Sequence, residues 1–217
     1  MASNMRHKVF VGLGNIGKRY EKTRHNMGFM IVDRLAERLG LELNEASRFK
    51  AKVAKGVVGQ VTVHLLEPTT YMNASGQAIE SYMKYFHLPV DDLCVVTDDV
   101  ALPFGNFRFR KEGSSGGHNG LKSVEQHLGS RQYARFRIGI AGEHHGKKPL
   151  DDYVLENFSR SELNELPDII ERAADTLEKL LTQDVESVMN EVNTRVKQVS
   201  EKKRQENKDE SNTEKSL

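Results

Sequence analysis

The stretch that decides the fold is "KVFVGLG", residues 8–14, a short apolar run that ends in glycines. A run of this length bounded by glycine predicts a buried strand. From Asn26 to Leu39 the apolar residues recur at helical spacing, and Gly40 is placed to end that helix. A buried strand followed by an amphipathic helix is typical of α/β proteins.

The rest of the chain continues this alternation. Two alternating runs around Gly59 predict a β-hairpin, and a helix capped by Asn73 or Ser75 follows it. Further strands are expected at 92–99, 105–112 and 134–142, and helices at 73–86, 121–129, 161–181 and 183–196. We therefore expect a single α/β domain over residues 1–196, with a twisted mixed β-sheet flanked by helices on both faces.

The C-terminal stretch, residues 197–217, differs from the domain that precedes it. It has almost no apolar residues and many charges of both signs. Such a segment cannot bury enough surface to offset the entropy lost on ordering. We expect a disordered charged tail or a frayed extension of the last helix.

Composition restricts the class of protein. The single cysteine, Cys94, excludes a disulfide within the chain, fits a reducing compartment, and is expected to be a small buried hydrophobe. No apolar run approaches the roughly 18 residues needed to span a bilayer, and the first ten residues lack the apolar core of a signal peptide. We therefore expect a soluble cytoplasmic protein that does not bind membranes.

The net charge of +1 hides an uneven distribution. Between Gly105 and Lys148, nine lysines and arginines accompany only three acidic residues. A local basic excess of this kind is typical of a phosphate-bearing partner, although a solvated face would show the same pattern. Charge alone leaves both interpretations open.

Several familiar motifs are absent or incomplete. "GLGNIG", residues 12–17, matches a dinucleotide fingerprint, but no helix begins at Gly17 and no acidic residue ends a second strand at the expected distance. The glycines are better explained by a tight turn at the sheet edge. His144 and His145 are adjacent, so they point apart, and no third metal ligand has useful spacing. Nothing marks a covalent nucleophile.

Asparagine and histidine recur where strands end or helices begin. The set comprises Asn15, His25, Asn26, Asn73, His118 and Asn119, together with Asp98 at the end of the "CVVTD" strand. In open α/β sheets these positions converge on one crevice, where ligands bind. Any one of these asparagines alone is better explained as a turn or cap, but the whole set indicates a site.

The motifs "GLGNIGKRYEKTRHNMGF", "PTTYMNASG", "SSGGHNGLKS" and "RFRIGI" occur in an order and spacing that resemble the bacterial-type peptidyl-tRNA hydrolase family. The resemblance covers residues 8 to about 195. It implies an enzyme that cleaves the ester joining a peptide to the 3′ end of tRNA and so recycles tRNA from prematurely released peptidyl-tRNA. It also implies a monomer that needs no metal and no cofactor.

The resemblance also assigns roles to residues. It makes His25 the catalytic base and Asp98 the acid that orients it. Asn15 and Asn73 would position substrate and water, and Asn119 would contact the peptide main chain. The remaining matches are Tyr20, Met72 and His118 at pocket-lining positions, and Arg110 and Arg137 as a basic pair that grips the 5′ phosphate of tRNA.

Two positions depart from the family pattern. Ile16 stands where a proline is usual, which loses a stiff turn but no polar group. Ala101 stands where a second acid is usual, three residues after Asp98, and its loss is expected to loosen the loop. Neither change removes a residue to which the chemistry is assigned.

These residue types suit ester hydrolysis by water. A histidine with an ordinary pKa of about 6.5 can act as a base near neutral pH, and an aspartate can fix its tautomer and stabilise the imidazolium. Asparagine amides can stabilise an oxyanion without adding a titrating group. The competing class is a non-catalytic protein of the same fold that binds RNA or a splicing partner, and turnover on peptidyl-tRNA separates the two.

Overall fold

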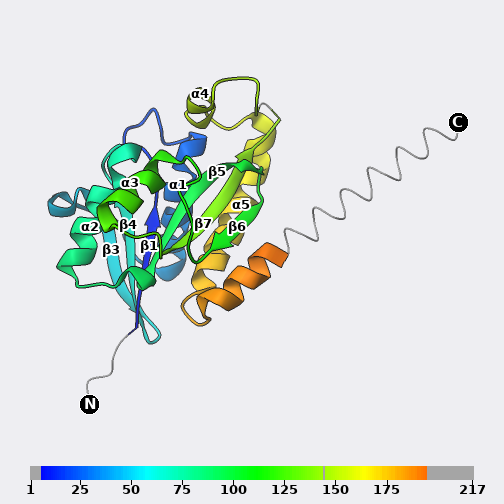
Figure 1. Cartoon of the computed structure of the whole chain (residues 1–217). Helices are drawn as coiled ribbons and strands as arrows, with labels where there is room; N and C mark the ends of the chain where they lie inside the picture. Colours follow the sequence, from blue (N-terminus) through cyan, green and yellow to red (C-terminus); the bar gives the residue numbers. More distant parts are fainter. Residues whose placement is uncertain (1–5, 144, 195–217) are drawn as a thin grey trace, which may run out of the picture.

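A single seven-stranded sheet organises the chain, as the computed structural model in Figure 1 shows. The structure describes residues 6–143 and 145–194, so the predicted tail at 197–217 and His144 lie outside the described residues. The strands are β1 (Arg6–Gly12), β2 (Asn44–Ala46), β3 (Ala51–Val58), β4 (Val61–Pro68), β5 (Leu93–Pro103), β6 (Phe107–Arg110) and β7 (Ala134–Ala141).

The sheet is mixed, in the order β2-β3-β4-β1-β5-β7-β6. Strands β4, β1, β5 and β7 are parallel, while β2 and β3 on one side and β6 on the other run antiparallel to their neighbours. The four parallel strands therefore end at the same edge, which is where α/β sheets bind ligands. The predicted hairpin around Gly59 is confirmed as β3 and β4.

Helices cover both faces of the sheet, as predicted. They are α1 (Met27–Leu39), α2 (Ser75–Tyr85), α3 (Asn119–Leu128), α4 (Leu150–Val154) and α5 (Arg160–Lys179), and residues 185–194 are also helical. Apolar residues of α1, α5 and 185–194 form one core, and those of α2 and α3 form the other. Among the described residues, no helix is long and apolar enough to cross a membrane.

Short 3-10 turns connect several of these elements. They are η1 (Arg24–Asn26), η2 (Ser47–Phe49), η3 (Met72–Ala74) and η4 (Val90–Asp92). The predicted cap of α2 was wrong, because the N-cap residue is Ala74 and no side chain caps the helix. Asn73 lies inside η3, and the Ser75 hydroxyl instead donates to the Met72 carbonyl, since the turn continues directly into the helix.

Glycines bring the first helix against the strand ends. A side chain at Gly12 would meet the Gly28 carbonyl oxygen at 2.4 Å, and one at Gly28 would meet the Leu13 nitrogen and the Val96 carbonyl oxygen at 2.4 Å. Gly12 and Gly28 therefore allow the start of α1 to contact the ends of β1 and β5 directly. This contact places the turn η1, which carries His25, at the sheet edge.

Candidate active site

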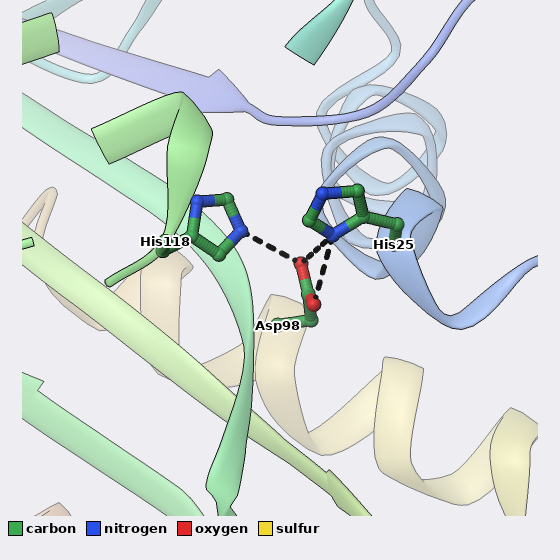
Figure 2. A group of neighbouring side chains, drawn as sticks. All are labelled: His25, Asp98 and His118. Carbon is green, nitrogen blue, oxygen red and sulfur yellow. Dashed lines mark hydrogen bonds and ion pairs between the residues drawn. The ribbon is translucent and has the colours of Figure 1, made fainter. Parts of the chain in front are cut away.

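Two histidines converge on one buried carboxylate at that edge. His25 comes from η1, Asp98 lies on β5, and His118 precedes α3. His25 Nδ1 lies 3.0 Å from both Asp98 carboxylate oxygens, and His118 Nε2 lies 3.0 Å from Asp98 Oδ1. Figure 2 shows the two rings on either side of the carboxylate. Three segments distant in sequence thus form one polar cluster.

The tautomer of His118 follows from its role as a helix cap. Its Nδ1 accepts hydrogen bonds from the backbone nitrogens of Gly120 and Leu121, at 3.1 and 3.3 Å. An atom that accepts two N–H groups carries no proton, so the proton of a neutral ring is on Nε2. There it can donate to Asp98 or to the Thr97 hydroxyl, which lies 2.7 Å away. His118 therefore supports Asp98 and has no free basic nitrogen.

His25 has the opposite arrangement. Its Nδ1 faces the carboxylate and donates to it, which leaves the lone pair on Nε2. Burial lowers the pKa of His25, but the charge and hydrogen bond of Asp98, together with the charge of Asp151, outweigh that effect, so the pKa lies above its usual value. Burial raises the pKa of Asp98, yet the charges of His25 and His118 and their hydrogen bonds hold it well below its usual range. Asp98 stays ionised and fixes His25 in the tautomer of a base.

The same three groups could in principle hold a metal, because their ligand atoms lie within 4.8 Å of one another. However, a metal on His118 Nε2 would require the proton to move to Nδ1, which already accepts two backbone N–H groups. Metal binding would also consume the His25 nitrogen that Asp98 orients. The donor set therefore fits a hydrogen-bonded relay better than a metal centre.

Asn15 joins this cluster to the neighbouring turns. Its backbone nitrogen donates to Asn26 Oδ1 at 2.8 Å, and Asn26 Nδ2 donates back to the Asn15 carbonyl at 3.0 Å. Its side-chain oxygen accepts from the Met72 backbone nitrogen at 2.9 Å. Asn15 therefore fixes η1 and η3 relative to each other through its oxygen, and its amide N–H groups remain to face a substrate.

The predicted site residues do not all line one cavity. A cavity of about 100 Å³ is lined by His25, Asp98, His118 and Asn119, and α4 contributes Leu150, Asp151 and Val154 to its wall. Met72 lies against the first turn of α3, since a side chain on Gly120 would meet its sulfur. Tyr20 is half-buried in the turn before η1, and Asn73 is exposed on η3. Both lie outside the cavity lining.

Sequence reasoning missed the residue that anchors η1, the turn that carries His25. Arg24 is 1% exposed, and its Nη2 donates to Glu162 of α5 at 2.8 Å. Its guanidinium also lies over the Tyr153 ring, 4.3 Å from the centroid, and its backbone nitrogen donates to the Glu156 carbonyl at 3.0 Å. An arginine in "KTRHN" gives no sequence signal of burial, because its partner lies 138 residues further on.

Arg110 and Arg137, the two residues predicted to bind a phosphate, lie on the same face of the sheet but differ in burial and in their partners. Phe107 and Phe109 are buried, while Arg110 is exposed on the opposite face of β6, as the alternation predicts. Arg137 on β7 is only 9% exposed and pairs with Asp99 at 3.2 Å. Its Nη2 also donates to the carbonyls of Ser114 and Ser115 in the glycine-rich loop. Arg110 is open to a ligand, whereas Arg137 already has partners.

The two departures from the family pattern lie at the rim of the site. Ile16 is exposed directly after Asn15, so the turn tolerates its side chain. The Ala101 backbone nitrogen donates to Asp99 Oδ1 at 2.8 Å, which holds the chain after Asp98 in place. Ala101 therefore belongs to strand β5 rather than to the loop expected from the sequence, and Asp99 holds its backbone.

Comparison with known proteins gives a consistent result. A family model described as "Peptidyl-tRNA hydrolase" matches residues 9–203. A peptidyl-tRNA hydrolase of Bacillus pumilus is 46% identical over 188 residues, which is 87% of this chain and 99% of that protein. One of Gloeobacter violaceus is also 46% identical, over 88% of this chain and 96% of that protein. The crystal structure of peptidyl-tRNA hydrolase from Acinetobacter baumannii matches with a TM-score of 0.80 and 31% identity, covering 87% of this chain and 95% of that one.

Proposed function

Since this chain belongs to the peptidyl-tRNA hydrolase family, we propose that His25, oriented by Asp98, is the general base of its reaction. The chain is a hydrolase that acts on peptidyl-tRNA, and its fold is that of the family. The observation that supports the mechanism is the pair of 3.0 Å contacts from His25 Nδ1 to Asp98, which leave Nε2 free to accept a proton.

Hydrolysis then proceeds in two steps. His25 Nε2 takes a proton from a water whose oxygen attacks the ester carbonyl, and a tetrahedral oxyanion forms. The resulting imidazolium is stabilised by Asp98, and it returns the proton to the ribose oxygen as the C–O bond breaks. The products are a peptide carboxylate and a tRNA with a free terminal ribose.

Asparagines supply the neutral hydrogen-bond donors that this charge development requires. Asn15 has its oxygen engaged by the Met72 backbone, so its N–H groups are the part available to the oxyanion or the peptide. Asn119 lines the His25 cavity and suits the peptide main chain. We assign exposed Asn73 and half-buried Tyr20 to the outer part of the substrate path, and buried Met72 to the floor beneath the first turn of α3.

Recognition of tRNA is assigned to phosphates rather than bases, because every substrate carries the same ester on a different tRNA. Arg110 is the accessible cation, and we propose that it makes the first contact with the terminal phosphate. Arg137 can contact the same phosphate only if its guanidinium binds the phosphate and the Asp99 carboxylate at once. The enzyme is proposed to act as a monomer in the cytoplasm, where translation takes place, and to need no metal.

The test is turnover on peptidyl-tRNA by the His25→Ala variant. We expect hydrolysis to be abolished while the variant stays folded and still binds tRNA, because the base is lost and the RNA contacts remain. Near wild-type turnover would refute the assignment of the base. Asp98→Asn should cost less than His25→Ala, because the base survives with a weaker orientation, and an equal loss would point to a direct role for Asp98.

A further inference from the structure

The short helix α4 forms one wall of the cavity that holds His25. Three of its residues, Leu150, Asp151 and Val154, line this cavity opposite His25, Asp98 and His118. Figure 1 shows α4 above the end of the sheet where β5 and β7 finish. The wall therefore adds the carboxylate of Asp151 to a cavity that His25 lines beside Asp98 and Asp99.

The position of α4 is fixed relative to His25. Arg24, the residue before His25, donates from Nη1 to the Tyr153 carbonyl at 3.4 Å. The Tyr153 hydroxyl donates to the Ile140 carbonyl at 2.6 Å and accepts from the Gly142 nitrogen at 3.0 Å, which ties α4 to the end of β7. These bonds therefore fix α4, which carries Asp151, relative to η1, which carries His25.

Asp151 has no other task in the described part of the chain. Within residues 6–143 and 145–194 it makes no hydrogen bond and no ion pair, and it is exposed on α4 next to Leu150 and Asp152, which are also exposed. Its carboxylate acts on His25 in the same sense as Asp98, raising the pKa of the imidazole. The adjacent Asp152 is also exposed in the same first turn of α4, but it does not line the cavity.

We propose that Asp151 is a positioning residue of the hydrolysis: it supplies a second negative charge, across the cavity from Asp98, that favours the imidazolium of His25. The other charged or titratable groups facing this cavity are Asp98, His118, Asp99 and Arg137. Arg137 and Asp99 are paired with each other, and Asp98 is shared by two histidines. This leaves Asp151 as the unshared charge among the residues that line the cavity.

The inference rests on the proposed role of His25, and it predicts its own change in the pH dependence of kcat/KM and in kcat. A base must be neutral to act, so the acid limb of kcat/KM reports its pKa. Removing a nearby carboxylate lowers that pKa, and the limb should move to lower pH. The plateau kcat should fall as well, because the imidazolium formed in the transition state loses support. An exposed carboxylate contributes about 0.2–1 kcal/mol, which corresponds to a loss of less than about fivefold in kcat.

The experiment compares the pH profiles of Asp151→Asn and Asp152→Asn with the wild type on peptidyl-tRNA at constant salt. Both variants remove one exposed charge from the first turn of α4, so effects on helix stability and on general attraction of RNA are matched. We expect Asp151→Asn to move the acid limb downward and to lower kcat, while Asp152→Asn follows the wild type. The melting temperatures of the two variants should agree.

The outcomes separate this inference from the proposed mechanism. Coinciding profiles for the two variants, with His25→Ala inactive, would overturn the role of Asp151 and leave His25 as the base. An active His25→Ala variant would instead overturn the base itself. A change in KM alone, with kcat and the acid limb unmoved, would also count against Asp151, because it would indicate a contact with substrate rather than an action through His25.

Discussion

The buried pair between Arg24 and Glu162 should be a main determinant of both stability and turnover. Arg24 is 1% exposed and Glu162 is 5% exposed, and the two are joined at 2.8 Å. Replacing Arg24 by Met keeps a long apolar stem but leaves the Glu162 carboxylate buried without its cation. Breaking a buried pair in this way costs about 3–5 kcal/mol.

A matched control is another arginine that bonds to α5. Arg34 of α1 also bonds to α5, through Glu171, but their side chains are 40% and 44% exposed. Exposed pairs of this kind contribute about 0–1 kcal/mol, so Arg34→Met should change stability little. The comparison holds the substitution constant and varies only burial and distance from the site.

The assay is urea unfolding followed by circular dichroism, combined with kcat measured where all variants are folded. Because Arg24 precedes His25 and anchors η1, Arg24→Met should also reduce kcat by roughly ten- to a hundredfold, the cost of misplacing a reacting group by a fraction of an ångström to one ångström. Adding Glu162→Gln to Arg24→Met should recover part of the stability. If Arg24→Met cost no more than Arg34→Met, the reasoning about the buried anchor would be refuted.

Further predictions concern other buried or basic groups. Burial and the neighbouring Asp33 raise the pKa of Glu67 to about 8, so the contribution of Glu67 to stability should decline as pH rises from 4.5 to 8, and urea titrations of Glu67→Gln should lack that part of the pH dependence. Burial, with the charges of neighbouring groups, lowers the pKa of His64 to about 4, so its ring carbon NMR signal should titrate near that pH, and the contribution of His64 to stability should fall as pH drops from 6.5 towards 4. Arg110→Ala should raise KM for peptidyl-tRNA with little change in kcat, because it removes a contact that contributes about 1.5–3 kcal/mol to binding. Hydrolysis of a short N-blocked aminoacyl oligonucleotide should not change. Equal impairment on both substrates would exclude a phosphate contact. Arg137→Ala should in addition lower the melting temperature, because Arg137 holds Asp99 and the glycine-rich loop; an unchanged melting temperature would contradict that structural role.

The features that could be predicted from sequence are those encoded by periodicity. The β-hairpin, the buried strand β5 and the helix α1 each carry an apolar repeat long enough to exclude the alternatives. The strand β2 and the helix α4 were not predicted, because three and five residues are too few to establish a period. The cap of α2 was assigned wrongly because η3 supplies the entry to the helix through its backbone.

The residues of the site also divide into those that sequence can predict and those that it cannot. Sequence could place His25 at the start of a helix and Asp98 on a buried strand, near the sheet edge where α/β sheets bind ligands. The predicted end of that strand at Asp98 and Asp99 was wrong, because β5 continues to Pro103 after an irregularity in its pairing with β7. It could not reveal that Arg24 is buried or that Arg137 is paired, because each depends on a partner in another part of the chain. An arginine next to a catalytic motif looks the same in sequence whether it binds RNA or a buried carboxylate.

The two His-Asn pairs of the chain show how the backbone assigns different tasks to the same residues. In "RHNMG" the turn η1 directs His25 Nδ1 to Asp98 and leaves Nε2 as a base. In "GHNG" the ring of His118 caps α3 instead, and its Nδ1 is consumed by two backbone N–H groups. Only one of the two imidazoles facing Asp98 can therefore accept a proton from water. The helix cap therefore supports the proposed assignment of His25 as the base, because it leaves His118 without a free basic nitrogen.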